Sequence, residues 1–334
     1  MIPEEKRDAV RVALMVAFGV ETYDAIEPLG AGLSTALLFR VEVHGQPYLL
    51  RVITRTDARA DPTRMFACME AAADAGIAPR IWYESVEDRV LITDFIETKP
   101  FPDDMAERMG AVLRTLHGLK PFPNILNYLD VMDGFVARFV AAGLVPEAEI
   151  AEFAAGYARL KAAYWQDDRD MVACHNDLKV ENVLFDGERV WLVDWEAGFL
   201  NDRYCDLAVV ANFFVSDAEE AYLEAYLQEV PGPERMAKFF LMRVRMSAIY
   251  AAYFLMLGTG VLAPTQGAVK PMEGEAAFDA DVMLPEFGEF HRKMVAGELN
   301  LLHRRAQVEY GTVHFREALR WMRMEQFAEA LGVV

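Results

Sequence analysis

Residues 175–185 read HNDLKVENVLF, and residues 185–196 continue as FDGERVWLVDWE. Asp177 and Asn182 stand five positions apart in a polar loop between apolar runs, and Asp194 ends the strand-like run WLVDW. Phosphoryl transfer from a nucleotide needs a carboxylate beside the attacking hydroxyl and oxygen ligands that hold Mg²⁺ against the phosphates. These three residues supply that set and predict a phosphotransferase site. The alternative is structural: a loop cap at Asp177 and Asn182, and a solvated strand end at Asp194.

Upstream of this stretch, residues 28–43 read PLGAGLSTALLFRVEV. Gly30 and Gly32 stand at a turn between two β-rich runs, and Ser34 follows them. Glycine lets the backbone approach phosphate oxygens closely, and a serine hydroxyl can donate a hydrogen bond to them. The turn is therefore a candidate phosphate-covering loop. A plain hairpin turn has the same composition and remains the alternative.

The wider pattern divides the chain into two parts. Residues 26–96 contain three β-rich runs, with Gly45 and Gln46 at a hairpin turn, and one helix between the second and third run. Helical patterns follow over residues 105–119, 133–142, 148–165, 217–230 and 235–257. We expect an α+β chain with a small lobe over residues 1–97, built on an antiparallel sheet and one helix, and a larger helical lobe over residues 98–334.

Composition narrows the function further. The formal charge of −19 repels phosphate backbones and anionic lipid, so neither nucleic acid nor a membrane surface is an expected partner. Three charged residues interrupt the apolar stretch 236–263, and the N-terminal apolar run lacks the features of a signal peptide. Cys174, His175 and Cys205 have no fourth ligand at the spacing of a zinc site, so a zinc site is not expected. The cysteines are far apart in the sequence, which favours a reducing, cytoplasmic location over a disulfide-bonded protein.

HNDLKVENVLF and the later VDWEAGFLNDRYCDLA together resemble the choline/ethanolamine kinase branch of the aminoglycoside phosphotransferase superfamily. The signature of that superfamily is HxDxxxxN followed by a strand that ends in Asp. The resemblance covers roughly residues 10–260. It implies a protein-kinase-like bilobal fold, ATP and Mg²⁺ as cofactors, and a small-molecule hydroxyl as acceptor.

The resemblance also assigns roles to residues of the catalytic stretch. It makes Asp177 the base that accepts the proton of the hydroxyl, and Asn182 and Asp194 the Mg²⁺ ligands. Asp206 and His175 become structural supports of the catalytic loop. Glu196 is either an additional carboxylate of the metal shell or part of a surface salt bridge.

For the nucleotide, the resemblance places Gly30, Gly32 and Ser34 over the phosphates and the backbone of Asp94 to Ile96 at the adenine edge. Arg51 stands where the wider superfamily has a lysine, and its guanidinium can bind the same phosphate oxygens through two hydrogen bonds. The carboxylate that would pair with Arg51 is not evident. Glu70 is a candidate on the expected helix, but it lies later than the family position.

The candidate residues for binding the acceptor are aromatic. Choline kinases hold the ammonium group in an aromatic box, and Tyr250 and Tyr253 are one helical turn apart at a comparable position, where core packing is the alternative. Trp195 and Tyr204 are further aromatic candidates. We expect phosphorylation of a cationic amino alcohol such as choline or ethanolamine. The alternatives are an aminoglycoside, a thiamine-like compound or a sugar as acceptor, and a nucleotide-binding pseudokinase.

Overall fold

The computed structural model describes residues 1–29, 36–57, 60–215, 218–262, 277–279 and 281–334. Its contacts form two units. The first unit comprises Met1–Pro102 and Glu181–Gly198, and the second comprises Asp103–Val180 and the described residues after Gly198. The stretch 175–196 is therefore shared, with Asp177 in the second unit and Asn182 and Asp194 in the first. Gly30, Gly32 and Ser34 lie outside the described residues.

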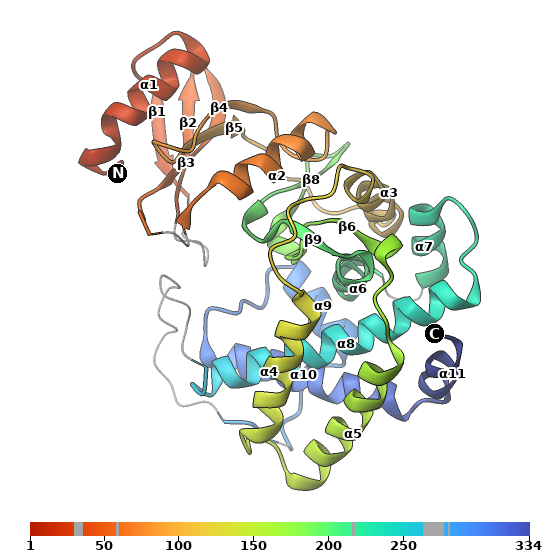
Figure 1. The fold of residues 1–334 in the computed structure, drawn as a ribbon. Coiled ribbons are helices and arrows are strands. Elements are labelled where there is room, and N and C mark those ends of the chain that lie inside the picture. The colour runs from red at the N-terminus through yellow and green to blue at the C-terminus, as the bar shows by residue number, and fades with distance from the viewer. Residues whose placement is uncertain (30–35, 58–59, 216–217, 263–276, 280) are drawn as a thin grey trace. The chain divides into compact units, whose positions relative to one another are not determined.

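The first unit is built on an antiparallel sheet with the strand order β1-β2-β3-β5-β4 (Figure 1). The side chains of β2 alternate between buried and more exposed positions, and its buried residues pack with those of α1 in one apolar core. The strands and helices of this sheet region are β1 (Ala25–Pro28), β2 (Ala36–Val43), β3 (Gln46–Ile53), β4 (Ile81–Ser85), β5 (Val90–Asp94), α1 (Arg7–Phe18) and α2 (Thr63–Asp74).

The β2–β3 hairpin has a two-residue turn. Val43 pairs with Gln46, so the turn residues are His44 and Gly45, with φ values of 54° and 71°. Two consecutive positive φ angles are typical of a type I′ turn, which glycine adopts without steric cost. The sequence prediction of Gly45 and Gln46 as the turn was wrong by one residue, because Gln46 already belongs to β3.

A second hairpin, of β7 (Val183–Phe185) and β8 (Val190–Leu192), belongs to the first unit. The amide of Leu192 donates to the carbonyl of Ile77 at 2.8 Å, and the amide of Lys99 donates to the carbonyl of Phe185 at 2.7 Å. The 3₁₀ turn Trp195–Ala197 follows the hairpin and packs against α2. These contacts attach the end of the catalytic stretch to the sheet region.

The second unit is mainly helical, with one small antiparallel sheet of β6 and β9. Its long helix α8 is 26 residues long and contacts α4, α5, α6, α10 and α11. The elements are α3 (Met105–His117), α4 (Tyr128–Ala141), α5 (Glu147–Ala163), β6 (Met171–Cys174), β9 (Phe199–Asp202), α6 (Arg203–Phe214), α7 (Glu219–Leu227), α8 (Pro233–Gly258), α9 (Phe287–Val295), α10 (Arg304–Arg323) and α11 (Glu325–Val333).

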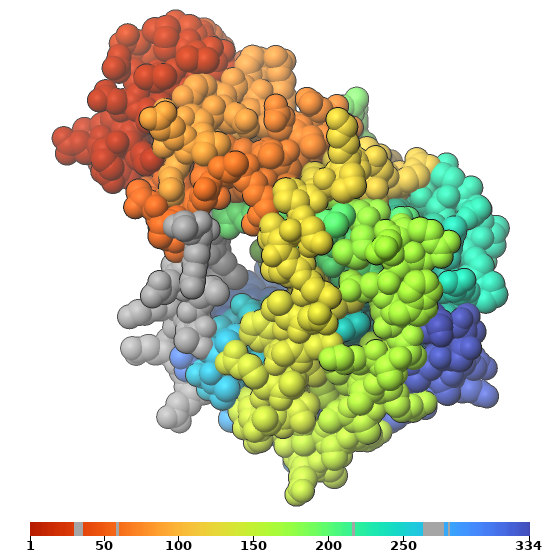
Figure 2. Space-filling view, viewed as in Figure 1, coloured from red at the N-terminus to blue at the C-terminus, as the bar shows by residue number. Residues whose placement is uncertain are grey.

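Helix α8 forms the core of the second unit. Within the described part of the chain it is the one helix whose length and composition would allow it to cross a membrane, and 78% of its most apolar window is buried inside the protein. In the space-filling view, α4 and α5 cover much of this face of the second unit and little of α8 is visible (Figure 2). Helix α10 approaches α8 closely, since a Cβ atom at Gly311 would lie 2.8 Å from the backbone nitrogen of Leu255.

Candidate active site

The loop that carries Asp177 begins directly after β6 and is held by a buried carboxylate. The two oxygens of Asp206, on α6, accept hydrogen bonds from the backbone amides of His175 and Asn176, each at 2.8 Å. Asp206 is 1% exposed and His175 is fully buried. Asn176 has a φ of 65°, a left-handed conformation that asparagine tolerates better than most residues. The resemblance implied this supporting role of Asp206, and the loop is anchored one residue before Asp177.

Asp177 itself remains accessible. Its side chain is 37% exposed, and one carboxylate oxygen lies 2.7 Å from the ammonium group of Lys179. The backbone amide of Asp177 donates to Nδ1 of His175 at 3.3 Å. The loop therefore presents a carboxylate next to a positive charge, which is a suitable arrangement for accepting a proton while an anionic group is transferred nearby.

The charge of Asp177 acts on two tyrosines of the second unit. Burial raises the pKa of Tyr253, on α8, and the charge of Asp177 raises this pKa further. The pKa of Tyr128, on α4, is raised well above its ordinary value by burial, then by Tyr250, with Asp177 among the further contributions. Sequence analysis missed Tyr128. The preceding residue, Asn127, caps α4 by accepting a hydrogen bond from the amide of Asp130, which fixes where the helix begins.

Two further aromatic candidates are enclosed by their own units. Trp195 is 1% exposed in the first unit, and its indole N–H donates to the carbonyl of Leu192 at 3.2 Å. Tyr204 is 4% exposed in the second unit. Tyr250 and Tyr253 are instead half-buried, and Tyr250 packs against the ring of His314 at 5.1 Å between centroids. Their burial argues against Trp195 and Tyr204 as residues that contact an acceptor.

In the first unit, the β7–β8 hairpin brings the two predicted metal ligands to one end. Val183 pairs with Leu192, and the amide of Val193 donates to the carbonyl of Asn182 at 3.0 Å. Asn182 directly precedes β7, and Asp194 follows β8 by two residues. The expectation that Asp194 ends the strand was wrong: β8 ends at Leu192, and Asp194 has a left-handed φ of 65° at the start of the 3₁₀ turn.

Arg51, on β3, makes ion pairs with this end of the hairpin. Its guanidinium lies 3.2 Å from a carboxylate oxygen of Asp194 and forms a second, short contact with Glu196. Arg51 is 7% exposed. Glu196 lies in the 3₁₀ turn that follows β8. The observed carboxylate partners of Arg51 therefore come from the hairpin end. Glu70 instead acts on Glu84 of β4, whose pKa is raised by burial and then by the charge of Glu70.

The donor set at the hairpin end suits a hard cation. Asn182, Asp194 and Glu196 offer amide and carboxylate oxygens, which Mg²⁺ prefers over nitrogen or sulfur. A different cluster, His117, Cys174 and Asp206, has potential ligand atoms within 4.8 Å of one another. Burial holds the pKa of the Cys174 thiol well above its ordinary value, which disfavours the thiolate that a metal would need. Hydrogen bonds join His117 to Asp206 and to Cys174, and Asp206 to the loop amides of His175 and Asn176.

The predicted adenine edge lies at the end of β5. The carboxylate of Asp94 accepts a hydrogen bond from the indole N–H of Trp82 at 2.7 Å, and its amide donates to the carbonyl of Arg80 at 3.0 Å. Ile96 follows the strand and is half-buried. These contacts fix the backbone where the adenine contact is expected, and that contact stays a prediction.

Comparison with known proteins adds a family match. A family model described as the phosphotransferase enzyme family matches residues 25–239. Protein LicA of Haemophilus influenzae is 33% identical over 78 residues, which are 21% of this chain and 23% of that protein. The aligned part is 29% of a second LicA protein, so the chain spans roughly a quarter of the length of the curated relatives it matches.

Solved structures share the fold at low sequence identity. A choline/ethanolamine kinase family protein from Mesorhizobium loti matches with a TM-score of 0.64 and 21% identity, over 98% of each chain. Choline kinase LicA from Streptococcus pneumoniae matches with a TM-score of 0.55 and 15% identity, over 87% of this chain and 97% of that one. A spectinomycin phosphotransferase has the same TM-score and identity, over 78% and 89%. The predicted α+β, kinase-like bilobal fold is thus confirmed.

Proposed function

The chain belongs to the phosphotransferase enzyme family, and on that premise we propose that it is a kinase that transfers the γ-phosphoryl group of ATP to the hydroxyl of a small cationic amino alcohol, such as choline or ethanolamine. The observation that carries this proposal is the accessible Asp177 carboxylate on an anchored loop, beside Lys179 and within electrostatic reach of Tyr128 and Tyr253. This arrangement combines a base, Asp177, with nearby tyrosine rings whose faces can attract a cation.

In the proposed reaction, the acceptor hydroxyl loses its proton to Asp177 as its oxygen attacks the γ-phosphorus. The bond from that phosphorus to the leaving ADP oxygen breaks, and the products are ADP and the phosphorylated alcohol. Asn182 and Asp194 would hold Mg²⁺, which neutralises charge on the phosphates when it is bound. Arg51, already directed to the hairpin end, would share its guanidinium with phosphate oxygens.

The acceptor class rests on the residues around Asp177. A quaternary or protonated amine is attracted by tyrosine faces and by a nearby carboxylate. The net charge of −19 adds a long-range attraction for cations and disfavours nucleic acid and anionic membranes as partners. The equal TM-scores of the choline kinase and the spectinomycin phosphotransferase do not separate the two acceptor classes. An aminoglycoside is therefore the second candidate, and a thiamine-like compound or a sugar is less favoured.

The complete polar set argues against a pseudokinase. Asp177, Asn182, Asp194 and Arg51 are all present, and loss of catalysis in kinase-like proteins usually removes a base or a metal ligand. Free cysteines that are buried and unpaired agree with a reducing, cytoplasmic location, which stays a prediction.

The test is Mg²⁺-dependent ADP release from ATP with a panel of choline, ethanolamine, a thiamine-like alcohol, several aminoglycosides and simple sugars. We expect release with the amino alcohols in the wild-type protein and not in Asp177→Asn. Release confined to an aminoglycoside or a sugar would replace the acceptor class. Release that is equal in both proteins would remove Asp177 from the reaction, and binding of ATP without any turnover would favour the pseudokinase.

A further inference from the structure

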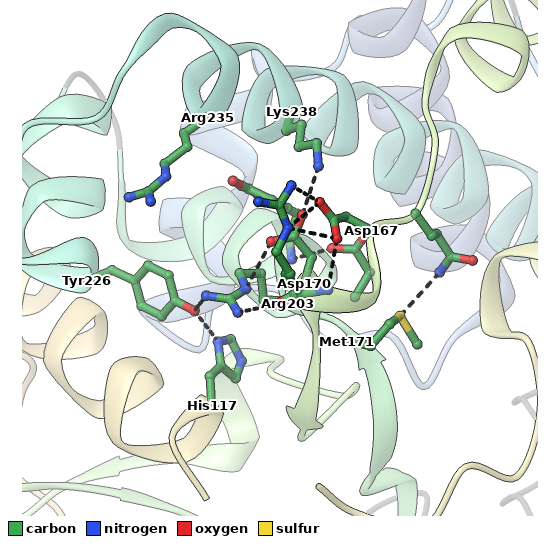
Figure 3. Close-up of polar contacts among 12 residues, drawn as sticks. His117, Asp167, Asp170, Met171, Arg203, Tyr226, Arg235 and Lys238 are labelled. Atoms are coloured by element: carbon green, nitrogen blue, oxygen red, sulfur yellow. Dashed lines mark hydrogen bonds and ion pairs between the residues drawn. The ribbon is translucent and has the colours of Figure 1, made fainter. Parts of the chain in front are cut away.

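A line of polar side chains crosses the second unit and ends at the catalytic loop. Arg203, on α6, donates to the hydroxyl of Tyr226, on α7, at 3.2 Å, and this hydroxyl lies 2.8 Å from Nδ1 of His117, on α3 (Figure 3). Nε2 of His117 lies 3.4 Å from a carboxylate oxygen of Asp206. The same carboxylate holds the amides of His175 and Asn176. Three helices, α3, α6 and α7, thus contribute side chains to one hydrogen-bonded line that ends at the loop.

The hydrogen positions in this line follow from chemistry. Both carboxylate oxygens of Asp206 accept hydrogen bonds from backbone amides, so Nε2 of His117 carries the hydrogen that points to Asp206. Burial lowers the pKa of His117, which keeps the imidazole neutral with a single N–H. Nδ1 is then an acceptor, and Tyr226 must donate to it. The guanidinium of Arg203, which has no acceptor atom, completes the line by donating to the Tyr226 oxygen.

The outer end of the line is fixed by charge. Nε of Arg203 lies 3.3 Å from a carboxylate oxygen of Asp170, and another of its nitrogens donates to the carbonyl of Arg169 at 2.6 Å. The other carboxylate oxygen of Asp170 accepts a hydrogen bond from the buried Lys238 at 2.8 Å (Figure 3). Arg203 is therefore held on two sides, and its orientation toward Tyr226 is determined by residues of η3 (Asp168–Asp170) and α8.

We propose that Tyr226 and Arg203 are positioning residues of the catalytic loop, which act by holding His117 in its Nε2–H tautomer. In this tautomer His117 donates to Asp206, and Asp206 stays directed toward the loop amides next to Asp177. The other tautomer would place the Nε2 lone pair against the carboxylate, and both groups would repel each other in a buried site. This inference rests on the proposed function, because it takes Asp177 as the base.

The chain offers a matched pair of substitutions. Tyr226→Phe removes the hydroxyl that donates to Nδ1 of His117 and thereby supports the Nε2–H tautomer. Tyr222→Phe removes another buried tyrosine hydroxyl of the same helix, whose hydrogen bond goes to the carbonyl of Leu207 at 3.2 Å and not to a side chain of the line. Tyr226→Phe loses two buried hydrogen bonds and Tyr222→Phe loses one, so a merely structural effect would lower the stability of both variants. Only Tyr226→Phe should disturb the loop.

The first readout is steady-state kinetics with the acceptor that the panel identifies. We expect kcat to fall on the order of tenfold in Tyr226→Phe, with the KM values for ATP and acceptor nearly unchanged, because a displaced base slows the chemical step and leaves binding intact. Tyr222→Phe should keep the wild-type kcat. Equal kcat values in the two variants would overturn the proposal.

The second readout does not depend on turnover. With ¹⁵N-labelled histidine, the wild-type spectrum should show His117 as the Nε2–H tautomer, identified as the signal that His117→Gln removes. In Tyr226→Phe this signal should shift toward a mixture of tautomers, and amide hydrogen exchange of the 175–177 backbone should speed up. An Nδ1–H or cationic His117 in the wild-type protein would overturn the inference, even if Tyr226→Phe fails to fold. If no acceptor is phosphorylated, the proposed function fails while these spectra still decide the inference.

Discussion

Asp177 and Lys179 lie two residues apart in the same loop, yet their side chains have different chemistry. Asp177 can accept a proton, whereas Lys179, whose ammonium group is 2.7 Å from it, can only donate hydrogen bonds and positive charge. We predict that Asp177→Asn lowers kcat by about 10³-fold, within the usual range for a lost general base. Lys179→Ala should cost much less, because it removes electrostatic help and leaves the base.

Measuring kcat and ATP binding in both variants checks this prediction. Asn keeps the size of Asp, so nucleotide affinity should be largely retained in Asp177→Asn. Similar residual rates in the two variants would contradict the assignment of the base, and normal rates in both would contradict the kinase interpretation.

Arg51 shows what single residues do and do not reveal in the sequence. The family resemblance predicted that Arg51 is a phosphate-binding cation. Its ion pairs with Asp194 and Glu196 could not be predicted, because these partners are 143 and 145 residues away along the chain. The left-handed conformation of Asp194 is likewise set by the turn that follows β8, and apolar alternation in WLVDW gave no sign of it.

At the scale of elements, periodicity predicted the helices that have one buried face. The predicted ranges 105–119 and 148–165 correspond to α3 and α5 within two residues at each end. Helix α6 was missed because its residues from Tyr204 to Phe213 are all buried, so no apolar stripe alternates with a polar face. The strands β1 and β4 are short and only partly buried, which leaves little alternation to detect.

The β7–β8 hairpin carries a prediction about Mg·ATP. A ligand that binds only the folded protein raises its melting temperature, and at about 100 times its Kd it stabilises by about 2.7 kcal/mol. We expect Mg·ATP to raise the melting temperature of the wild-type protein and to have little effect on Asp194→Ala. The control is Glu188→Ala, which removes an exposed carboxylate at the opposite end of the same hairpin. Equal shifts in wild type and Asp194→Ala would remove Asp194 from the metal site.

Helix α8 carries a prediction about the acceptor. A partly desolvated cation–π contact is worth about 0.5–2 kcal/mol, so Tyr250→Leu or Tyr253→Leu should raise the acceptor KM by up to roughly thirtyfold. Leucine keeps apolar bulk and removes the aromatic face. The KM for ATP should hardly change.

A matched control lies on the same helix. Phe240→Leu removes a buried ring that packs against Trp321, about 15 Å along the helix from Tyr250. This variant should lose stability and keep the acceptor KM. If the acceptor KM is unchanged in Tyr250→Leu and Tyr253→Leu as well, both tyrosines belong to the core and the aromatic argument for an amino alcohol is wrong.

At the scale of the whole molecule, the helices after the family match contribute buried titratable groups. The family model ends at residue 239, whereas His291 on α9 and His314 on α10 are 1% and 0% exposed. Nδ1 of His314 lies 3.0 Å from the hydroxyl of Ser247 on α8, and the two histidine rings pack at 5.2 Å between centroids. Burial lowers the pKa of His291 to about 4 and that of His314 well below its ordinary value. Folding therefore keeps both imidazoles neutral.

This difference between folded and unfolded states makes stability depend on pH. An unfolded histidine has a pKa of about 6.5, so between about pH 6.5 and pH 4 the unfolded chain binds more protons at position 291 than the folded protein. The contribution of His291 to the free energy of unfolding is complete above about pH 6.5. It is lost as the pH falls, by up to about 1.4 kcal/mol per pH unit. His314 acts in the same direction.

Asp202 acts in the opposite direction. Burial raises the pKa of Asp202 from 3.8 to about 6. Between these two pH values the folded protein binds more protons at Asp202 than the unfolded chain does. The contribution of Asp202 to the free energy of unfolding therefore falls as the pH rises through this range. The stability curve of the wild-type protein is therefore a sum of opposing contributions. A comparison of variants isolates the part that belongs to His291.

We predict that His291→Phe flattens the acid side of the stability curve. Phenylalanine suits the aromatic surroundings of position 291, which include Phe213, Phe287 and Tyr310, and it cannot bind a proton. Urea unfolding midpoints at about pH 7.5, 6 and 5 should drop less in this variant than in the wild-type protein. The control is His303→Gln at an exposed histidine, which should follow the wild-type curve. If His291→Phe loses as much stability between about pH 7.5 and pH 5 as the wild-type protein, the imidazole at position 291 does not remain neutral on folding, and the acid sensitivity must come from other groups.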